Sequence, residues 1–189
     1  MRPSTPSTSR FHFSLVALVA LASFAGLAAC EPVPPDCQQT WGSTAKSATP
    51  LTTAPIITAR AGRNDCFDRF VVEVNGAPAP GWNVRYVDQA TQPGSGHVVA
   101  LRGGARIQST INAPAYNLAG QTTYQPANSN EAVSVVGFTT LRQVAYLGSF
   151  EGYSDFGLGV RARLPFRAFI LPGPGGHNRL VIDVAHAWP

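Results

Sequence analysis

The chain has 189 residues and a formal net charge of +4, and it is poor in charged residues but rich in glycine and proline. This abundance of glycine and proline excludes a protein built on long helices. The charge is also too small to predict a nucleic-acid-binding protein, because Arg2 and Arg10 stand in a leader segment whose removal lowers the net charge to +2.

The first 30 residues have the layout of a bacterial export signal. Arg2 and Arg10 precede an uncharged apolar stretch over residues 11–27. That stretch is at the lower length limit for a membrane span, so a transmembrane helix is the competing interpretation. Cleavage is favoured because the sequence Leu27-Ala-Ala-Cys30 resembles the lipobox of bacterial lipoproteins. We therefore expect a signal peptide over residues 1–29 and acyl chains such as palmitate on Cys30, which tether the protein to the outer face of the cytoplasmic membrane.

Residues 30–55 are expected to form a spacer after the lipidated cysteine. The segment 31–36 is too rich in proline for a helix, and the segment 38–55 is rich in Ser, Thr, Ala and Pro with little apolar periodicity. Cys37 and Cys66 remain as an even pair in an exported chain, which predicts a disulfide. A redox pair of thiols and a metal site are the alternatives, and the spacing of the two cysteines favours neither.

From Ile56 onward the apolar residues recur with a period of two, as they do in half-buried strands. About 160 residues remain after cleavage, enough for one domain with a sizeable core. We place that domain at residues 56–189. The fold class is therefore all-β, a small antiparallel sandwich or barrel. The expected strands lie within residues 68–75, 82–86, 105–111, 160–164, 166–171 and 179–186.

Two segments depart from the strand pattern. Residues 138–148 carry Leu141, Val144, Ala145 and Leu147 at helix-like spacing, which is compatible with one short helix. Residues 112–130 form the longest stretch without a pattern and are expected to be a loop, either functional or merely mobile.

Motifs for catalysis and metal binding are weak. The sequence Gly94-Ser-Gly-His97 lacks the glycine spacing of a hydrolase nucleophile elbow and predicts a hairpin turn instead. The histidines at 97, 177 and 186 lie too far apart in sequence to predict a zinc site, and no cofactor motif is present. Glu151 and Asp155 form a close acidic pair between aromatic residues, which leaves a glycosidase as a remote alternative. We therefore expect a protein that is not an enzyme.

Arginine recurs beside acidic residues within the apolar strands. Asp68-Arg69 opens one strand, and Arg179 and Asp183 lie in the last one. Such residues either form structural ion pairs between neighbouring strands or line one sheet face and bind an anionic polymer. The sequence leaves both interpretations open.

Several segments resemble the AMIN-like domain of actinobacterial lipoproteins, which is related to the AMIN module that targets amidases and secretins to peptidoglycan. The resemblance covers residues 41–186 and rests on the segments 60–69, 84–87, 94–96, 164–167 and 179–186. It implies a small β-sandwich that binds peptidoglycan or another wall polymer. It also marks Arg69, Arg179 and Asp183 as wall-contact or fold-defining positions. Asn64 stands where family members often carry histidine.

These observations support three hypotheses. The first is an envelope lipoprotein that binds peptidoglycan or an associated polymer through arginine and aromatic side chains, with Arg69, Arg85, Tyr86, Arg167 and Arg179 as candidate contacts and with Asp68 and Asp183 as candidate structural ion-pair partners. The second is a lipoprotein that docks on another envelope protein. The third is a wall hydrolase that uses Glu151 and Asp155.

Overall fold

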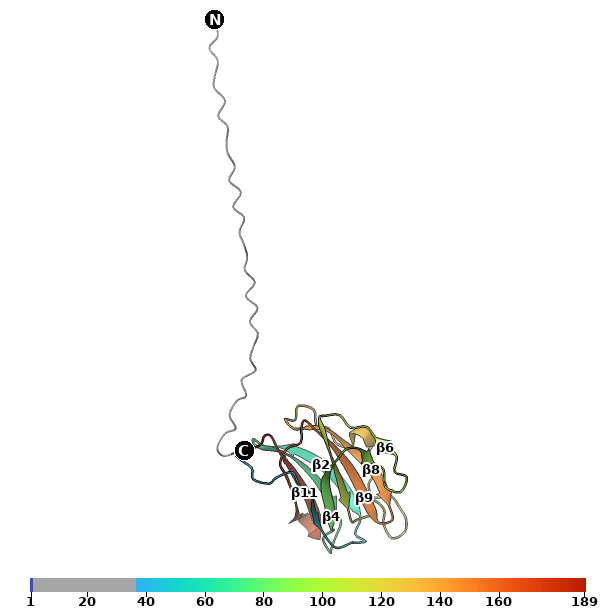
Figure 1. The fold of residues 1–189 in the computed structure, drawn as a ribbon. Helices are drawn as coiled ribbons and strands as arrows, with labels where there is room; N and C mark the ends of the chain where they lie inside the picture. Colours follow the sequence, from blue (N-terminus) through green and yellow to red (C-terminus); the bar gives the residue numbers. More distant parts are fainter. Residues whose placement is uncertain (2–36) are drawn as a thin grey trace. The chain divides into compact units, whose positions relative to one another are not determined.

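The computed structural model describes Met1 and residues 37–189 (Figure 1). The expected signal peptide and the lipidated Cys30 lie outside the described residues. The regular elements of the folded part are β1 (Lys46–Ala48), β2 (Ile56–Arg63), β3 (Phe67–Val74), β4 (Trp82–Val87), β5 (Ala90–Thr91), β6 (Val98–Val99), β7 (Ala105–Ile111), the short 3-10 helix η2 (Ser129–Glu131), β8 (Leu141–Phe150), β9 (Tyr153–Val160), β10 (Phe166–Pro172), a second 3-10 turn η3 (Pro174–Gly176), and β11 (Asn178–Ala185). None of the helices in the described part is long and apolar enough to cross a membrane.

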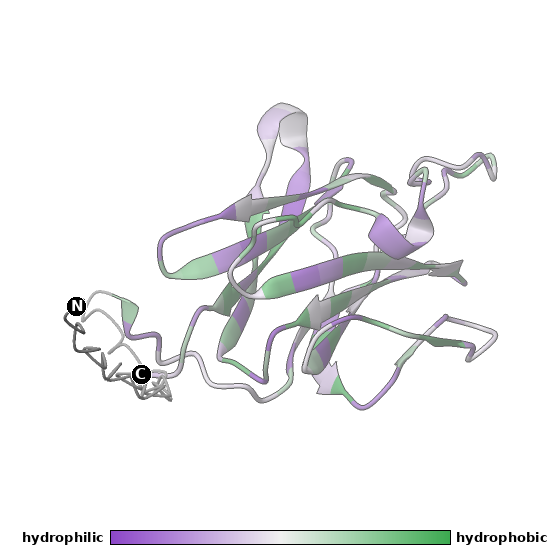
Figure 2. Cartoon of the chain, turned by 90° about the horizontal axis from the view of Figure 1, so that it is seen from above, coloured by the Kyte–Doolittle hydropathy of each residue, from purple (hydrophilic) through white to green (hydrophobic). Residues whose placement is uncertain are grey.

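Two antiparallel sheets pack face to face, so the expected β-sandwich is confirmed. One sheet has five strands in the order β1-β4-β7-β9-β8, and the other has four in the order β10-β11-β3-β2. Apolar and polar segments follow one another along several of these strands, as the colouring of Figure 2 shows. The longer strands turn an apolar row toward the partner sheet.

Aromatic rings occupy the middle of the core between the sheets. Phe70 of β3 packs against Phe156 of β9 with ring centroids 5.2 Å apart, and Tyr146 of β8 lies 5.3 Å from Phe156. Tyr124 completes this cluster from the segment 112–130. That segment is therefore anchored rather than free, and an isolated bridge between Tyr116 and Thr122 closes it further.

The segment that was compatible with a short helix is strand β8, and the helical alternative is wrong. Leu141 and Val144 face the main core, whereas Ala145 and Leu147 face a second, smaller cluster on the other side of the sheet. Register shifts after Leu141 and after Tyr146 add extra residues to the strand. Burial on both faces together with these irregularities produces apolar spacing that imitates a helix.

The second cluster exists because the chain folds back over the outer face of the five-stranded sheet. Residues 90–101, which include the β5–β6 hairpin, cover β8 and β9 there, and Leu101 packs with Ala145 and Leu147. The Gly94 to Gly96 segment forms the turn of this hairpin, as expected. The backbone after Leu101 crosses β9 so closely that a Cβ atom on Gly159 would lie 2.0 Å from the carbonyl oxygen of Arg102.

Part of the stretch assigned to the spacer belongs to the folded domain. Strand β1 pairs with β4 over three residues, Thr52 is buried, and Trp41 packs edge-on against Phe67 at 5.7 Å. A three-residue strand is too short to leave a period in the sequence, which is why the pattern of residues 38–55 gave no sign of it. The disulfide between Cys37 and Cys66 is confirmed, with Cα atoms 5.0 Å apart.

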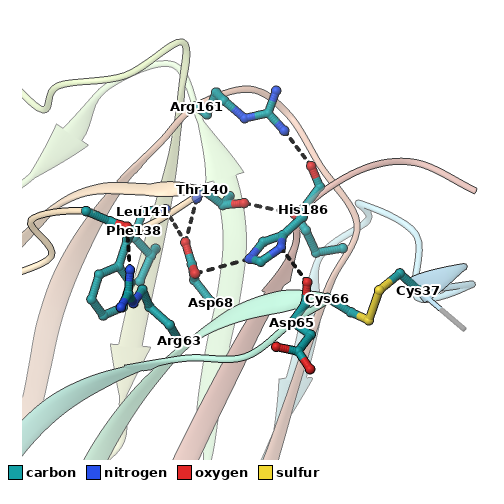
Figure 3. Close-up of polar contacts among 12 residues, drawn as sticks. Cys37, Arg63, Asp65, Cys66, Asp68, Phe138, Thr140, Leu141, Arg161 and His186 are labelled. Atoms are coloured by element: carbon teal, nitrogen blue, oxygen red, sulfur yellow. Dashed lines mark hydrogen bonds and ion pairs between the residues drawn. A yellow bond between two sulfur atoms is a disulfide. The ribbon is translucent and has the colours of Figure 1, made fainter. Parts of the chain in front are cut away.

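A buried carboxylate joins the two sheets at the end where β3 begins. Asp68 is fully buried and accepts hydrogen bonds from the backbone N–H groups of Thr140 and Leu141 at the start of β8 (Figure 3). Its other oxygen lies 3.2 Å from Nε2 of His186. Asp68 therefore makes structural contacts, as one of the two interpretations expected. Its side-chain partner is a histidine rather than an arginine of a neighbouring strand.

Candidate functional site

The outer face of the four-stranded sheet gathers most of the arginines that the sequence singled out. Alternation places Phe70, Val72 and their neighbours in the core, so the residues between them point outward. We use the name basic sheet face for the outward residues of β2, β3, β10 and β11 that carry charge or a large apolar group. They are Arg60, Phe67, Arg69, Glu73, Arg167, Phe169, Leu171, Arg179 and Asp183.

Three charged residues form a row across this face. The register aligns Arg167 of β10 with Asp183 of β11, and Asp183 with Arg69 of β3. Nε and Nη2 of Arg69 donate to the two carboxylate oxygens of Asp183 at 2.6 and 2.9 Å, and Nε of Arg167 donates at 2.8 Å. Asp183 is fully buried beneath these groups. One carboxylate thus orients two guanidinium groups and leaves the row with a net positive charge.

Aromatic rings surround the exposed side of this row. The guanidinium carbon of Arg167 lies 4.4 Å from the ring centroid of Trp41, 5.0 Å from that of Phe169 and 5.5 Å from that of Phe67. Arg69 lies over Phe67 at 5.2 Å. These cation–π contacts hold the guanidinium planes against the sheet. The terminal nitrogens of Arg167 make no hydrogen bond within residues 37–189, so they are free to bind a ligand.

A second polar group lies farther along the same face. Oε2 of Glu73 accepts from Nη1 of Arg60 at 2.9 Å, and Oε1 lies 2.8 Å from Nδ1 of His177. The hydrogen bond with His177, followed by that with Arg60, lowers the pKa of Glu73 below its ordinary value. Arg179 stands opposite Glu73 in the register and donates to the carbonyl of Pro172, while its Nε is buried without a partner in the described part of the chain.

Arg85 and Tyr86 do not share this face, because both belong to β4 in the other sheet. Arg85 is exposed and donates to the Asn83 side chain. The Tyr86 hydroxyl both donates to the carbonyl of Leu164 and accepts from its N–H, each at 2.8 Å. Its ring packs edge-on against Phe166. Tyr86 is therefore committed to internal contacts.

Glu151 and Asp155 occupy different environments. Glu151 is exposed in the tight turn between β8 and β9, with a φ of 48°. Asp155 is buried on the outer face of β9 and accepts from Nε2 of Gln108 at 2.8 Å. Burial raises the pKa of Asp155, and hydrogen bonds from Thr110 and Gln108 oppose that rise. An exposed turn residue and a carboxylate covered by the hairpin segment do not form an open two-carboxylate cleft.

The arrangement on the basic sheet face is suited to binding. It offers oriented guanidinium donors for carboxylate or phosphate, and aromatic side chains beside them for sugar rings. Trp41, Phe67 and Phe169 were not among the predicted contacts. The alternation of residues 166–171 does place Phe169 on the same face as Arg167, so this member was accessible from the sequence, whereas Trp41 lies outside any periodic segment.

The comparison with protein families agrees with the resemblance found in the sequence. The family model described as the AMIN-like domain matches residues 54–186, which is more than half of the chain. Comparison with curated proteins gave no match. The matched range contains every strand from β2 to β11 and thus the whole basic sheet face, but it omits Trp41 and β1.

Proposed function

Because the chain belongs to the AMIN-like domain family, we propose that it is a non-catalytic envelope lipoprotein whose β domain binds peptidoglycan or an associated wall polymer. In this proposal a lipid on Cys30 tethers the mature protein to the outer face of the cytoplasmic membrane. The family supports an envelope location, and the lipobox at residues 27–30 supports the tether.

The row of Arg69, Asp183 and Arg167 is the observation that carries the binding role. Wall polymers present carboxylates or phosphates beside sugar rings. The row presents guanidinium groups oriented by a buried carboxylate, with Trp41 and Phe169 beside them. A flat face of this kind suits an extended polymer better than a small molecule in a deep cavity.

Purified cell-wall sacculi test the proposal in a sedimentation assay with residues 31–189, which lack the lipid acceptor. The variant Arg60→Gln/Arg167→Gln/Phe169→Ala keeps the Arg69–Asp183 pair and should bind sacculi at least ~10-fold more weakly, since each charge-assisted contact contributes about 1.5–3 kcal/mol. Raising the salt concentration should weaken binding of the unmodified domain, because screening acts on exposed charges.

Arg85→Gln is the matched control, since it removes one exposed arginine from the other sheet. It should leave sacculus binding unchanged. Loss of binding in Arg85→Gln with none in the triple variant would move the site to the five-stranded sheet. Failure of the unmodified domain to sediment at low salt would contradict wall binding altogether.

Docking on an envelope protein is the second candidate, and one exposed residue favours it. The side chain of Asn117 caps the N–H groups of Ala119 and Gln121, and the turn so formed presents Leu118 with 90% of its surface exposed. Leu118 borders a hollow of about 290 Å³ that is also lined by Leu51 and Tyr116. Crosslinking in intact cells should then return one dominant protein, and Leu118→Ser should abolish that product.

The non-catalytic part of the proposal has its own test. If Glu151 and Asp155 were a catalytic pair, the domain would release reducing sugars from sacculi and Glu151→Gln would abolish the release. We expect no release from the unmodified domain, because Asp155 is buried behind Gln108.

A further inference from the structure

The disulfide lies at one end of the sandwich, which we call the disulfide end. There β2 and β11 end and β3 begins, directly after Cys66. The backbone N–H of His186 donates to the carbonyl of Cys66. Arg161 donates to the carbonyl of His186 (Figure 3), so the strand ends and the loops of both sheets are tied together. Arg163 likewise joins the β9–β10 loop to Ser43. The two sheets therefore contribute to a single surface at this end.

Six arginines gather at the disulfide end, and none of them belongs to the basic sheet face. They are Arg63, Arg102, Arg106, Arg142, Arg161 and Arg163. The acidic residues of this end are Asp65, Asp88, Glu131, which pairs with Arg102, and the buried Asp68. The surface is therefore positive. At the opposite end, the loops at residues 49–55, 75–81, 112–124 and 151–152 carry a single charged residue, Glu151.

Two exposed apolar side chains stand among these arginines. Trp188 is 47% exposed, and its indole N–H donates to the carbonyl of Arg163. Val136 is 92% exposed, and its neighbour Gly137 accepts a hydrogen bond from Arg63. A tryptophan and an aliphatic residue set among arginines match the composition of protein surfaces that lie at the membrane–water boundary.

A polar hollow opens on the same surface. Its volume is about 530 Å³, and Arg106, Arg163, Asp88 and Gly104 are among the residues that line it. The Nε and Nη2 nitrogens of Arg163 bond to Ser43, which fixes the guanidinium at the rim. Arg106 has no hydrogen-bond or ion-pair partner among residues 37–189. This hollow has the size and charge to accept the headgroup of an anionic glycerophospholipid.

The length of the tether brings this surface to the bilayer. Seven residue steps separate Cys30 from Cys37, so even a fully extended chain spans only about 25 Å. We propose that the disulfide end docks on the membrane by binding anionic phospholipid headgroups. The inference rests on the lipid tether of the proposed function, but it concerns a different set of arginines from those of the basic sheet face. The tether and the arginines together then hold the domain with its opposite end, where Glu151 is the charged residue of the loops named above, pointing away from the bilayer.

Vesicle sedimentation tests the proposal with residues 31–189, since the core and the disulfide lie within residues 37–189. At low salt, the domain should bind phosphatidylcholine vesicles that contain phosphatidylglycerol and should not bind vesicles of phosphatidylcholine alone. The variant Arg106→Gln/Arg161→Gln/Arg163→Gln should bind at least ~10-fold more weakly, because each arginine near an anionic surface contributes roughly five-fold.

The matched control Arg60→Gln/Arg179→Gln removes two arginines from the basic sheet face and should bind these vesicles like the unmodified domain. Equal binding to neutral and anionic vesicles, or an effect confined to the control variant, would overturn the proposal. The variant Arg106→Gln/Arg161→Gln/Arg163→Gln should bind sacculi as the unmodified domain does. Palmitate labelling of Cys30 in cells tests the tether separately. A failure of the tether can therefore be distinguished from a failure of phospholipid binding by the disulfide end.

A second measurement tests the proposal if the variant Arg106→Gln/Arg161→Gln/Arg163→Gln does not fold. Lipids with brominated acyl chains quench tryptophan fluorescence on contact, and the exposed Trp188 should be quenched by anionic vesicles that carry them. Trp188→Phe should remove most of that quenching. Quenching that is absent in the unmodified domain, or undiminished in Trp188→Phe, would contradict docking by this end.

Discussion

Asp68 shows how one side chain can determine the fit between two sheets. Its buried carboxylate accepts both N–H groups at the start of β8, which is the edge strand of its sheet and pairs with β9 on one side only. Thr140 reinforces the junction by donating its hydroxyl to the carbonyl of Ala185. The residue type was evident from the sequence, but its partner was not, since His186 lies 118 positions away.

Replacement of Asp68 by alanine should therefore be strongly destabilising. The substitution leaves the N–H groups of Thr140 and Leu141 buried without acceptors, at a cost of about 2–5 kcal/mol. Asp68→Asn keeps one acceptor oxygen and should cost less. Urea unfolding measures both, with the exposed Asp65→Asn as a control that should stay within about 0.5 kcal/mol of the unmodified domain. If Asp68→Ala left the free energy of unfolding unchanged, that result would contradict the structural role of Asp68.

Replacement of Asp155 should have the opposite effect on stability from replacement of Asp68. The environment of Asp155 disfavours the charged form of its carboxyl group. Its folded pKa lies above that of the unfolded chain, so the folded state loses stability as pH rises from the unfolded pKa through the raised folded pKa. Asp155→Asn removes the buried charge and keeps an oxygen for Gln108. The variant should be more stable at neutral pH by on the order of 1 kcal/mol, and its advantage should vanish below the unfolded pKa.

Thermal unfolding of Asp155→Asn across a pH series measures this difference. Glu73→Gln is an informative comparison of opposite sign, because the lowered pKa of Glu73 means that its charged form stabilises the fold above the unfolded pKa. That contribution is lost as pH falls through the folded pKa. Identical pH profiles for the two variants would contradict both assignments.

Among the elements, the Val- and Ile-rich strands β3 and β11 could be predicted from the sequence, whereas β8 could not. The strands β3 and β11 contain runs of Val, Ile, Leu and Phe, and both were expected near their observed limits. In β8, both faces carry apolar residues and the register shifts twice. The apolar residues of β8 therefore do not recur with a period of two. The information that distinguishes β8 from a helix lies in residues 90–101, which cover its outer side.

The crossing of that covering segment over β9 gives a prediction at the level of elements. Gly159→Ala would place a methyl group against the carbonyl of Arg102, where backbone occupies the space, so the crossing segment must shift. We expect a loss of at least about 2 kcal/mol in urea unfolding. Gly62→Ala is the matched control, because a methyl group there meets no atom within 4 Å, and it should be neutral or stabilising by up to about 1 kcal/mol.

The basic sheet face was only partly predictable for a similar reason. Arg69, Asp183 and Arg167 could be singled out from the sequence. Their contact depends on strand register, which brings Arg69 beside Asp183 although the two lie 114 positions apart. Pattern and composition do not determine strand register over such distances. Trp41 contacts Arg167 from a segment without any period, so its role is visible in the fold alone.

At the scale of the whole molecule, the disulfide closes a long loop that contains β1 and β2. It joins residues 29 positions apart, which should stabilise the domain by roughly 3–4 kcal/mol. Cys37→Ser/Cys66→Ser should therefore lower the Tm by about 10 °C. Adding a reductant to the unmodified domain should reproduce that shift. A Tm that is the same with and without reductant would contradict a stabilising disulfide.

The same bond also decides how the domain carries mechanical load. If the chain is held by a lipid at one end and by the wall at another, any displacement between the two pulls on Cys37. The bond passes that force directly to the start of β3, an inner strand paired along its length with both β2 and β11. Residues 38–65 are bypassed. Without the bond the pull would reach β1 first, and its three residue pairs with β4 would peel apart one after another.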